Sequence, residues 1–271
     1  MTGQLLVVTG GHRIDEVAFA EMVDAVCGTL DWTWRREEQP SAQALLSPAH
    51  AGEWDAILFH DLPGLHLRRG EPPAPFGPTQ EIRDALTALF DTGIGVVATH
   101  HALAGWPAWD GWATALGGRY WYAPGTLRGR ALPSSGYRWG DVHIDVVAPD
   151  HPVCAGLASF VIDDEQYLCP MFADEVVPLL ATSDPADPRL FTSTLEAVVD
   201  GIETPCDATV EGSRLLAWAK VAGRSPVVYI QPRHSVSTMR APMYRRLLGN
   251  ALSWVASEQA RRWAMDAPAP F

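Results

Sequence analysis

Residues 96–101, Val96-Val97-Ala98-Thr99-His100-His101, join a short β-branched run to two adjacent histidines. A brief, continuous apolar run is typical of a strand that is buried on both faces of a sheet. Polar residues directly after such a strand lie at its carboxyl end, where open α/β sheets bind their ligands. The stretch therefore predicts a central parallel strand with a histidine site at its end.

Three further apolar runs resemble this one, and segments of helical periodicity separate them. The runs are Leu5–Val8, Ala56–Phe59 and Pro226–Ile230. The segments Glu16–Leu30 and Glu81–Phe90 carry apolar residues at spacings of three and four, as amphipathic helices do. Strands that alternate with helices favour a parallel sheet covered on both faces. The pattern predicts an α/β fold with a doubly wound, mostly parallel sheet.

One segment departs from this alternation and indicates an extension of the sheet. Apolar and polar residues alternate over Asp141–Val147, which is typical of a half-exposed strand in an antiparallel edge extension. A chain of 271 residues is long enough for one large core. We expect a single domain over residues 1–262, with a C-terminal helix over Asn250–Arg262, followed by a frayed tail over residues 263–271.

The composition excludes several classes of partner. The formal net charge is −12 and no basic segment stands out, which argues against a nucleic-acid partner. No apolar stretch reaches the ~20 residues that a membrane-spanning helix needs. The four cysteines form no CxxC pair, as expected for a reduced, cytoplasmic protein. A neutral small molecule is the partner that fits these features best.

A histidine follows each of the four predicted strands. The residues at these ends are Gly11 and His12 after the first strand, His60 and Asp61 after the second, His100 and His101 after the third, and His234 after the last. Any one of them has a structural explanation, such as a turn or a loop cap. No Ser or Cys occupies a nucleophile elbow here, so the set indicates acid–base or metal chemistry rather than a covalent intermediate.

Tryptophans follow the histidine pair closely in the sequence. Trp106 and Trp109 lie within nine residues of His100. An indole ring beside a polar site suits stacking against the C–H face of a sugar, although tryptophan also fills protein cores. We expect these two side chains to bind substrate.

A series of short motifs occurs in a fixed order along most of the chain. The motifs are Leu6-Val7-Val8-Thr9-Gly10-Gly11-His12, the segment Asp91–Ala102 with His100, Gly117-Gly118-Arg119-Tyr120, Asp150-His151-Pro152 with Gly156-Leu157, Asp164-Glu165-Gln166-Tyr167, and Arg233-His234. In this order they resemble the ThuA-like (trehalose-utilisation) family. That resemblance implies the flavodoxin-like fold of the class I glutamine amidotransferases and a role in carbohydrate metabolism.

The sequence departs from the family pattern around the expected site. His101 stands where the family usually has Ser, Arg233 replaces a Gly, and Tyr122-Ala123-Pro124 occupies the place of a common His-Pro pair. Because family resemblance carries the fold better than the function, the substrate does not transfer automatically.

The combined reading predicts an enzyme that acts on a sugar, keto-sugar or glycoside as an isomerase, lyase or hydrolase, and not as a glutaminase. Histidine titrates near neutral pH and suits proton transfer, with a carboxylate as a second acid–base group. The expected catalytic residues are His100, His101, Glu165 and His12. The expected substrate-binding residues are Gly11, His60, Asp61, Trp106, Trp109, Arg119, Tyr167 and His234.

Two alternatives stay open. A divalent metal such as zinc or manganese would find ligands in His12, His100, His101, His234 and Glu165, which would have to converge from separate strand ends because no HExxH spacing is present. The other alternative is a non-catalytic sugar-binding or regulatory module of amidotransferase-like fold that lacks the cysteine nucleophile. A homodimer would be an ordinary assembly for either.

Overall fold

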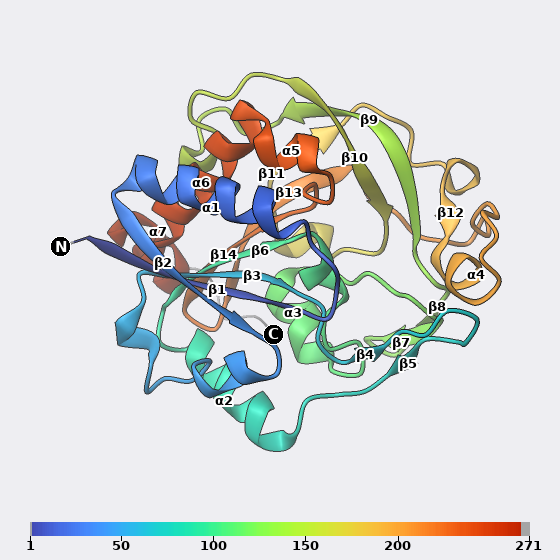
Figure 1. Cartoon of the computed structure of the whole chain (residues 1–271), viewed down its shortest axis with the longest axis horizontal. Coiled ribbons are helices and arrows are strands. Elements are labelled where there is room, and N and C mark those ends of the chain that lie inside the picture. The colour runs from blue at the N-terminus through green and yellow to red at the C-terminus, as the bar shows by residue number, and fades with distance from the viewer. Residues whose placement is uncertain (1, 267–271) are drawn as a thin grey trace.

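A sheet of ten strands crosses the molecule in the computed structural model, which describes residues 2–266 (Figure 1). Its path runs β10-β9-β11-β13-β14-β6-β3-β1-β2, and β12 pairs with β9 beside this path. The strands are β1 (Gly3–Gly10), β2 (Trp32–Glu38), β3 (Ala56–Asp61), β6 (Gly95–Thr99), β9 (Gly136–Val146), β10 (Phe160–Leu168), β11 (Val177–Thr182), β12 (Thr192–Ser193), β13 (Leu215–Ala222) and β14 (Ser225–Ile230).

Five strands form the parallel part of the sheet, in the order β2-β1-β3-β6-β14. This is the flavodoxin-like order, in which the chain passes from β1 to β2 on one side and then continues on the other side of β1 with β3, β6 and β14. The four predicted apolar runs fall in β1, β3, β6 and β14, and every residue of β3, β6 and β14 is buried. The predicted doubly wound, mostly parallel sheet is confirmed.

The remaining strands form the antiparallel extension. Strand β13 pairs antiparallel with β14, β11 with β13, and β9 with β11. The predicted strand over Asp141–Val147 lies in β9, which begins earlier, at Gly136, and pairs along nine positions with β10 at the edge. The sequence patterns did not identify β2, β10, β11 or β13 as strands.

Helices cover both faces of the sheet and create two apolar cores (Figure 1). Along β1, Leu5 and Val7 face one core, whereas Leu6 and Val8 face the other, as the alternation of a strand requires. The first core packs against α1 (Glu16–Leu30), α5 (Val236–Arg240), α6 (Pro242–Val255) and α7 (Glu258–Asp266). The second packs against α2 (Gln80–Phe90) and α3 (Asp110–Leu116).

The C-terminal helix differs from the prediction. Two helices, α6 and α7, occupy the region where one helix over Asn250–Arg262 was expected. Helix α7 continues through residue 263 to Asp266; Trp263 packs against the first core and Ala264 is buried. The expected frayed tail is therefore wrong for residues 263–266, and residues 267–271 lie outside the described part of the chain.

Two short hairpins and one short helix lie in the loops outside the main sheet. They are the hairpins β4 (Leu65–His66) with β5 (Ala74–Pro75) and β7 (Gly125–Leu127) with β8 (Arg130–Leu132), and the helix α4 (Thr194–Val199). Among residues 2–266, no helix combines the length and the apolar character that crossing a membrane requires.

Candidate functional site

His100 occupies a sharp turn at the carboxyl end of β6. A short 3-10 turn over His100–Ala104 follows the strand directly, and His100 itself has a φ of 49°. A non-glycine residue in the left-handed region is uncommon and strained, and it marks the position that presents the nucleophile in α/β hydrolases. In this chain the same kind of turn presents an imidazole ring.

The ring of His100 is held in one tautomer by a backbone carbonyl. Its Nδ1 lies 2.9 Å from the carbonyl oxygen of Gln231, which directly follows β14. Because a carbonyl only accepts hydrogen bonds, Nδ1 carries a proton, and in the neutral ring Nε2 carries the lone pair. The side chain of His100 is fully buried.

A carboxylate and a second imidazole converge on the lone pair of His100. Oε2 of Glu165 lies 3.1 Å from Nε2 of His100 and 3.3 Å from Nδ1 of His234. The two nitrogen atoms are 3.0 Å apart. Burial raises the pKa of Glu165, but its interactions with His100 and His234 outweigh that effect and bring the pKa to about 2. Glu165 is therefore ionised at neutral pH.

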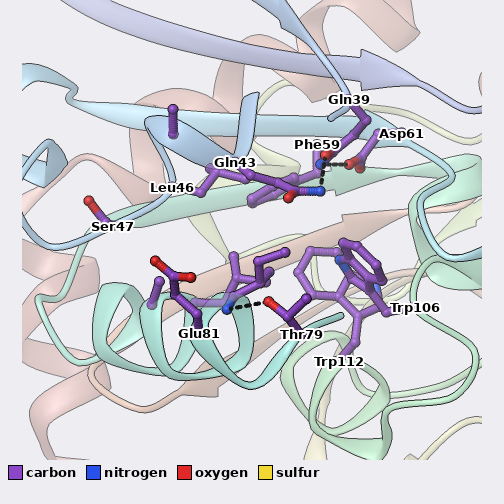
Figure 2. A pocket seen from close by; sticks show the side chains of 14 residues that line it. Gln39, Gln43, Leu46, Ser47, Phe59, Asp61, Thr79, Glu81, Trp106 and Trp112 are labelled. Atoms are coloured by element: carbon purple, nitrogen blue, oxygen red, sulfur yellow. Dashed lines mark hydrogen bonds between the residues drawn. The ribbon is translucent and has the colours of Figure 1, made fainter. Parts of the chain in front are cut away.

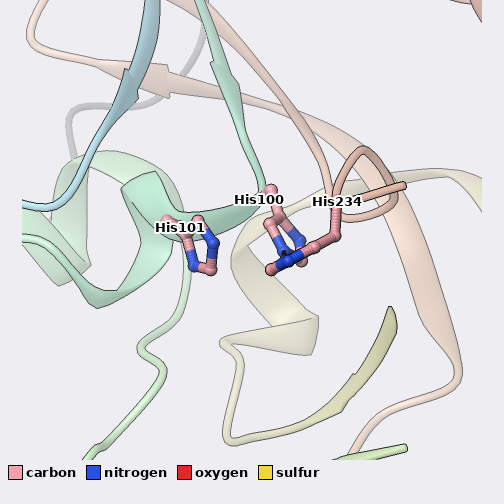
Figure 3. Close-up of side chains that lie close together, drawn as sticks. All are labelled: His100, His101 and His234. Carbon is pink, nitrogen blue, oxygen red and sulfur yellow. Dashed lines mark hydrogen bonds between the residues drawn. The ribbon is translucent and has the colours of Figure 1, made fainter. Parts of the chain in front are cut away.

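Tyr167 connects this cluster to His101. Its hydroxyl lies 3.0 Å from Nε2 of His100 and 2.9 Å from Nδ1 of His101. Figure 3 shows His100 and His101 leaving the end of β6 and His234 reaching toward them from the loop after β14. The ring centroid of His12 lies 3.7 Å from that of His101. The structure thus brings together four predicted catalytic residues with Tyr167 and His234.

Burial keeps the outer imidazoles neutral. Removal from water lowers the pKa of His12 to about 4 and holds the pKa of His101 well below its ordinary value. A neutral imidazole has one nitrogen that can accept a proton. Both rings are therefore bases at neutral pH.

Asp164 fixes the backbone on which the cluster depends. Its Oδ1 accepts hydrogen bonds from the backbone N–H groups of Glu165, His234 and Ser235, at 2.7, 2.9 and 3.1 Å. The side chain is fully buried. One carboxylate thus connects β10 to the loop after β14. Because Glu165 lies on β10 and His234 lies in that loop, Asp164 holds both members of the Glu165–His234 pair in place.

His60 lies at the base of the same site but is engaged elsewhere. Its Nδ1 lies 2.9 Å from the hydroxyl of Thr99, and Nη1 of Arg233 donates to its Nε2. Burial and the Arg233 charge hold the pKa of His60 well below its ordinary value. With both nitrogens occupied, His60 positions Arg233 rather than carrying protons.

The histidines line a cavity of about 190 Å³. Its wall includes His100, His101 and His234, together with Arg13 and Arg233. Trp139 stands beside His234, with ring centroids 4.7 Å apart in an edge-to-face arrangement, and 52% of Trp139 is exposed. Trp139 pairs across the strands with Glu165, so the two side chains share one face of the sheet.

A larger cavity, of about 430 Å³, contains two other predicted substrate-binding residues, Asp61 and Trp106. Figure 2 shows Gln39 donating to Asp61 and Gln43 reaching the side chain of Gln39. Asp61 follows His60 directly on β3, and successive side chains of a strand point to opposite faces. Asp61 and Trp106 therefore lie apart from the histidine cluster. Burial raises the pKa of Asp61 to about 7.

The other three predicted binding residues have structural surroundings. A Cβ atom on Gly11 would lie 2.2 Å from the carbonyl oxygen of Leu62, so the glycine permits a close approach of two chain segments. Arg119 is fully buried and donates to the carbonyl oxygens of Gly105, Trp106 and Trp109. The backbone of Trp109 is one of these acceptors, and its partly buried side chain packs against the second core.

Sequence reasoning missed Gln231, Asp164 and Trp139 as members of the site. Gln231 follows a predicted strand directly, so the strand-end argument that selected His234 applies to it as well. Asp164 precedes Glu165 within a quoted motif. Trp139 lies on β9, and no sequence pattern indicated that this strand borders the cluster.

Imidazole nitrogens of His100, His101 and His234 lie within 4.8 Å of one another, which is close enough for one metal ion to bind them. Glu165 adds a carboxylate oxygen at hydrogen-bond distance from two of them. His12 adjoins this group through its ring contact with His101. All five predicted ligands thus lie in or next to one cluster.

Comparison with known families gives a match over nearly the whole chain. The model of the ThuA family, described as trehalose utilisation, matches residues 4–255. No curated protein matches the chain significantly.

Solved structures share the fold at low sequence identity. A ThuA-like protein from Bacteroides uniformis is 20% identical, with a TM-score of 0.64, over 94% of this chain and 92% of its own. One from Parabacteroides merdae is 13% identical, with a TM-score of 0.62, over 95% and 91%. A cytoplasmic protein from Salmonella typhimurium is 9% identical, with a TM-score of 0.55, over 93% and 99%. At these identities the likeness concerns the fold alone.

Proposed function

The chain belongs to the ThuA family, described as trehalose utilisation, and on this premise we propose that it is an enzyme that moves a proton on a sugar or keto-sugar in the histidine-lined cavity. Isomerase, lyase and hydrolase reactions of such compounds all require a proton to leave a carbon or to reach a leaving oxygen. The family match supports only the broad role in carbohydrate use. The reaction type is our proposal.

The hydrogen-bond chain through Tyr167 carries the proposal. With Nε2 of His100 as an acceptor, the Tyr167 hydroxyl donates to it and accepts from Nδ1–H of His101. Nε2 of His101 then holds a lone pair in a ring that lines the cavity. His101 is thereby prepared as a base, and the relay can pass charge to His100.

The opposite side of the cavity is suited to hold a sugar oxygen. His234 lines the same cavity and, with ionised Glu165 beside its ring, can donate a hydrogen bond to a carbonyl or hydroxyl oxygen. Trp139, exposed at the side of His234, offers an apolar ring face to the C–H groups of a sugar. Proton acceptors and an oxygen site thus face one cavity.

Hydrogen–deuterium exchange tests this proposal directly. The purified protein would be incubated in D₂O with a keto form of trehalose, with trehalose as the unoxidised reference, and deuterium at the carbon beside the carbonyl would be followed by NMR. We expect exchange or product formation with the wild-type protein. His101→Ala should slow it at least about 100-fold, within the range for loss of a general base. An unchanged rate in His101→Ala would reject His101 as the base.

A non-catalytic sugar-binding module is the second candidate. The turn after β6 presents His100 where an amidotransferase-like enzyme would present a thiol. Cys169, which follows β10, is buried, and burial raises its pKa to about 12, so it is a poor nucleophile. Saturable sugar binding by calorimetry, with no exchange and no product for any keto-glycoside, would favour this candidate.

A further inference from the structure

Three donor atoms in the histidine cluster form a nearly equilateral triangle. They are Nε2 of His100, Nδ1 of His234 and Oε2 of Glu165, and the edges measure 3.0, 3.1 and 3.3 Å. The atoms come from three separate segments: the end of β6, the loop after β14, and β10. Two imidazoles and one carboxylate with open positions are a recurrent ligand set for divalent transition metals.

Too few protons are available to join the three atoms of the triangle by hydrogen bonds. The carbonyl of Gln231 accepts a hydrogen bond from Nδ1–H of His100, so a neutral His100 brings only a lone pair to the triangle. Glu165 brings only lone pairs as well. The Tyr167 hydroxyl lies 3.0 Å from Nε2 of His100, and within residues 2–266 the only other proton near the triangle is the ring proton of His234. With a neutral His100, no proton of these residues lies on the edge between Nε2 of His100 and Oε2 of Glu165, two acceptor atoms that are 3.1 Å apart.

A metal ion would satisfy all three atoms at once. Zinc binds imidazole nitrogen at about 2.0–2.1 Å and carboxylate oxygen at about 2.0–2.2 Å, so neighbouring ligand atoms lie roughly 3.0 Å apart in octahedral and 3.4 Å apart in tetrahedral coordination. The three measured edges fall in this interval. The geometry points to a divalent transition-metal site formed by His100, His234 and Glu165.

The surroundings have the features of a metal site beyond its ligands. Histidine ligands usually donate their second N–H to a carbonyl or carboxylate, as His100 does to Gln231. Asp164 holds the backbone of both Glu165 and His234. Two buried carboxylates, Asp164 and Glu165, accompany one buried cation, Arg233, so a positive ion would improve the local charge balance.

The ligand set also limits the identity of the ion. Imidazole suits zinc, copper, iron or nickel, whereas calcium and magnesium prefer oxygen ligands. A ring nitrogen of His101 lies within 4.8 Å of the other histidine ligands and provides a fourth donor nearby. His100 and His234 line the cavity, so an ion that they hold would be open to water or a sugar oxygen there. Such an ion would take the lone pair of His100 that otherwise accepts from the Tyr167 hydroxyl. This use of the ion rests on the proposed function, but metal binding itself does not.

Cobalt titration tests the site. Untagged protein, stripped with a chelator and freed of it by dialysis, would be titrated with Co²⁺ and followed by visible absorption, and with Zn²⁺ by calorimetry. We expect one equivalent per chain. Glu165→Gln and His234→Ala should each weaken binding at least about 100-fold, because loss even of an outer-shell partner costs 10- to 100-fold. His50→Ala, an exposed histidine whose partner is Glu53, is the matched control.

The outcomes separate this inference from the proposed function. Binding of less than a stoichiometric amount by the wild type, or equal affinity in Glu165→Gln and the wild type, would overturn the metal site. Circular dichroism of each variant excludes misfolding as the cause of lost binding, and His234→Asn replaces His234→Ala if the latter unfolds. Deuterium exchange by metal-free protein would leave the proposed function standing without a metal. Stoichiometric metal binding without any deuterium exchange would support the metal site and reject the proposed function.

Discussion

The hydroxyl of Tyr167 lies 2.9 Å from Nδ1 of His101. This contact joins β10, at the edge of the antiparallel extension, to the turn after β6 in the parallel part of the sheet. Neither part of the sheet contains the site alone, because the bases come from the parallel strands and Glu165 and Tyr167 come from the extension. The extension is therefore a part of the site.

Removal of the Tyr167 hydroxyl should slow proton transfer while substrate binding persists. In Tyr167→Phe, His101 loses the partner that fixes its tautomer, and His100 loses a donor. We expect kcat for deuterium exchange to fall about 10- to 100-fold, with KM changing much less. Tyr137→Phe is the control, since Tyr137 is the half-buried cross-strand neighbour of Tyr167. A proportional rise in KM instead would show that Tyr167 binds substrate.

Trp139 should contribute to substrate binding. Its exposed ring stands beside His234, and an aromatic contact contributes about 0.5–1.5 kcal/mol. Trp139→Ala should therefore raise KM, or the Kd of a sugar measured by calorimetry, by roughly 2- to 10-fold with little change in kcat. Val161→Ala on the adjacent strand removes a side chain that is equally exposed, at 52%, and should leave KM unchanged. Equal KM in Trp139→Ala and the wild type would exclude a stacking role.

Asp164 should stabilise the fold as well as the site. Asp164→Ala leaves three backbone N–H groups without their acceptor, and we expect the free energy of unfolding to fall by about 3 kcal/mol in urea denaturation. Asp164→Asn keeps an acceptor oxygen and should cost less. Asp163→Ala, whose side chain is exposed on the same strand, is the control. A cost below that of the control would contradict this role.

The stability of the protein should depend on pH through Asp61. Its pKa is raised to about 7 by burial, whereas a carboxyl of this type in an unfolded chain titrates near 3.9. The native state therefore binds the extra proton between about pH 4 and pH 7, and its stability falls as pH rises through this interval, by up to about 4 kcal/mol.

Asp61→Asn removes this titration. The difference in unfolding free energy between about pH 5 and pH 8 should be smaller in the variant than in the wild type, as urea denaturation would measure. The exposed Asp84→Asn on α2 should behave as the wild type does. Identical pH dependence in Asp61→Asn and the wild type would show that Asp61 is ionised throughout this range.

The parallel strands could be predicted because burial on both faces selects continuous apolar runs, which are recognisable in the sequence. The strand-end rule then located His12, His100, His101 and His234 correctly at one edge of the sheet. It could not separate His60 from Asp61, because adjacent residues of a strand face opposite cores and the face depends on the whole sheet.

Strands β10, β11 and β13 of the antiparallel extension are the largest part of the fold that the sequence did not predict. Strands β10 and β11 mix buried and exposed residues without the regular alternation of a half-exposed strand, and β13 is almost wholly buried. One partner of β11, strand β13, is distant from it in sequence. For that reason the aromatic neighbour of the cluster, Trp139, could not be distinguished from the tryptophans after His101. Arg119 resembled a binding residue because a charged side chain in a short motif gives no sign that carbonyl groups surround it.

Position 100 must meet two separate requirements, because its backbone is left-handed and its side chain belongs to the site. The chain conformation admits glycine, asparagine, aspartate and histidine most readily and disfavours β-branched side chains, whatever the chemistry of the site. The imidazole requirement is separate, since it concerns only the contacts of Nδ1 and Nε2. In a saturation library, selection for folded protein should therefore retain a small group of residues at position 100, and selection for function should reduce that group to histidine.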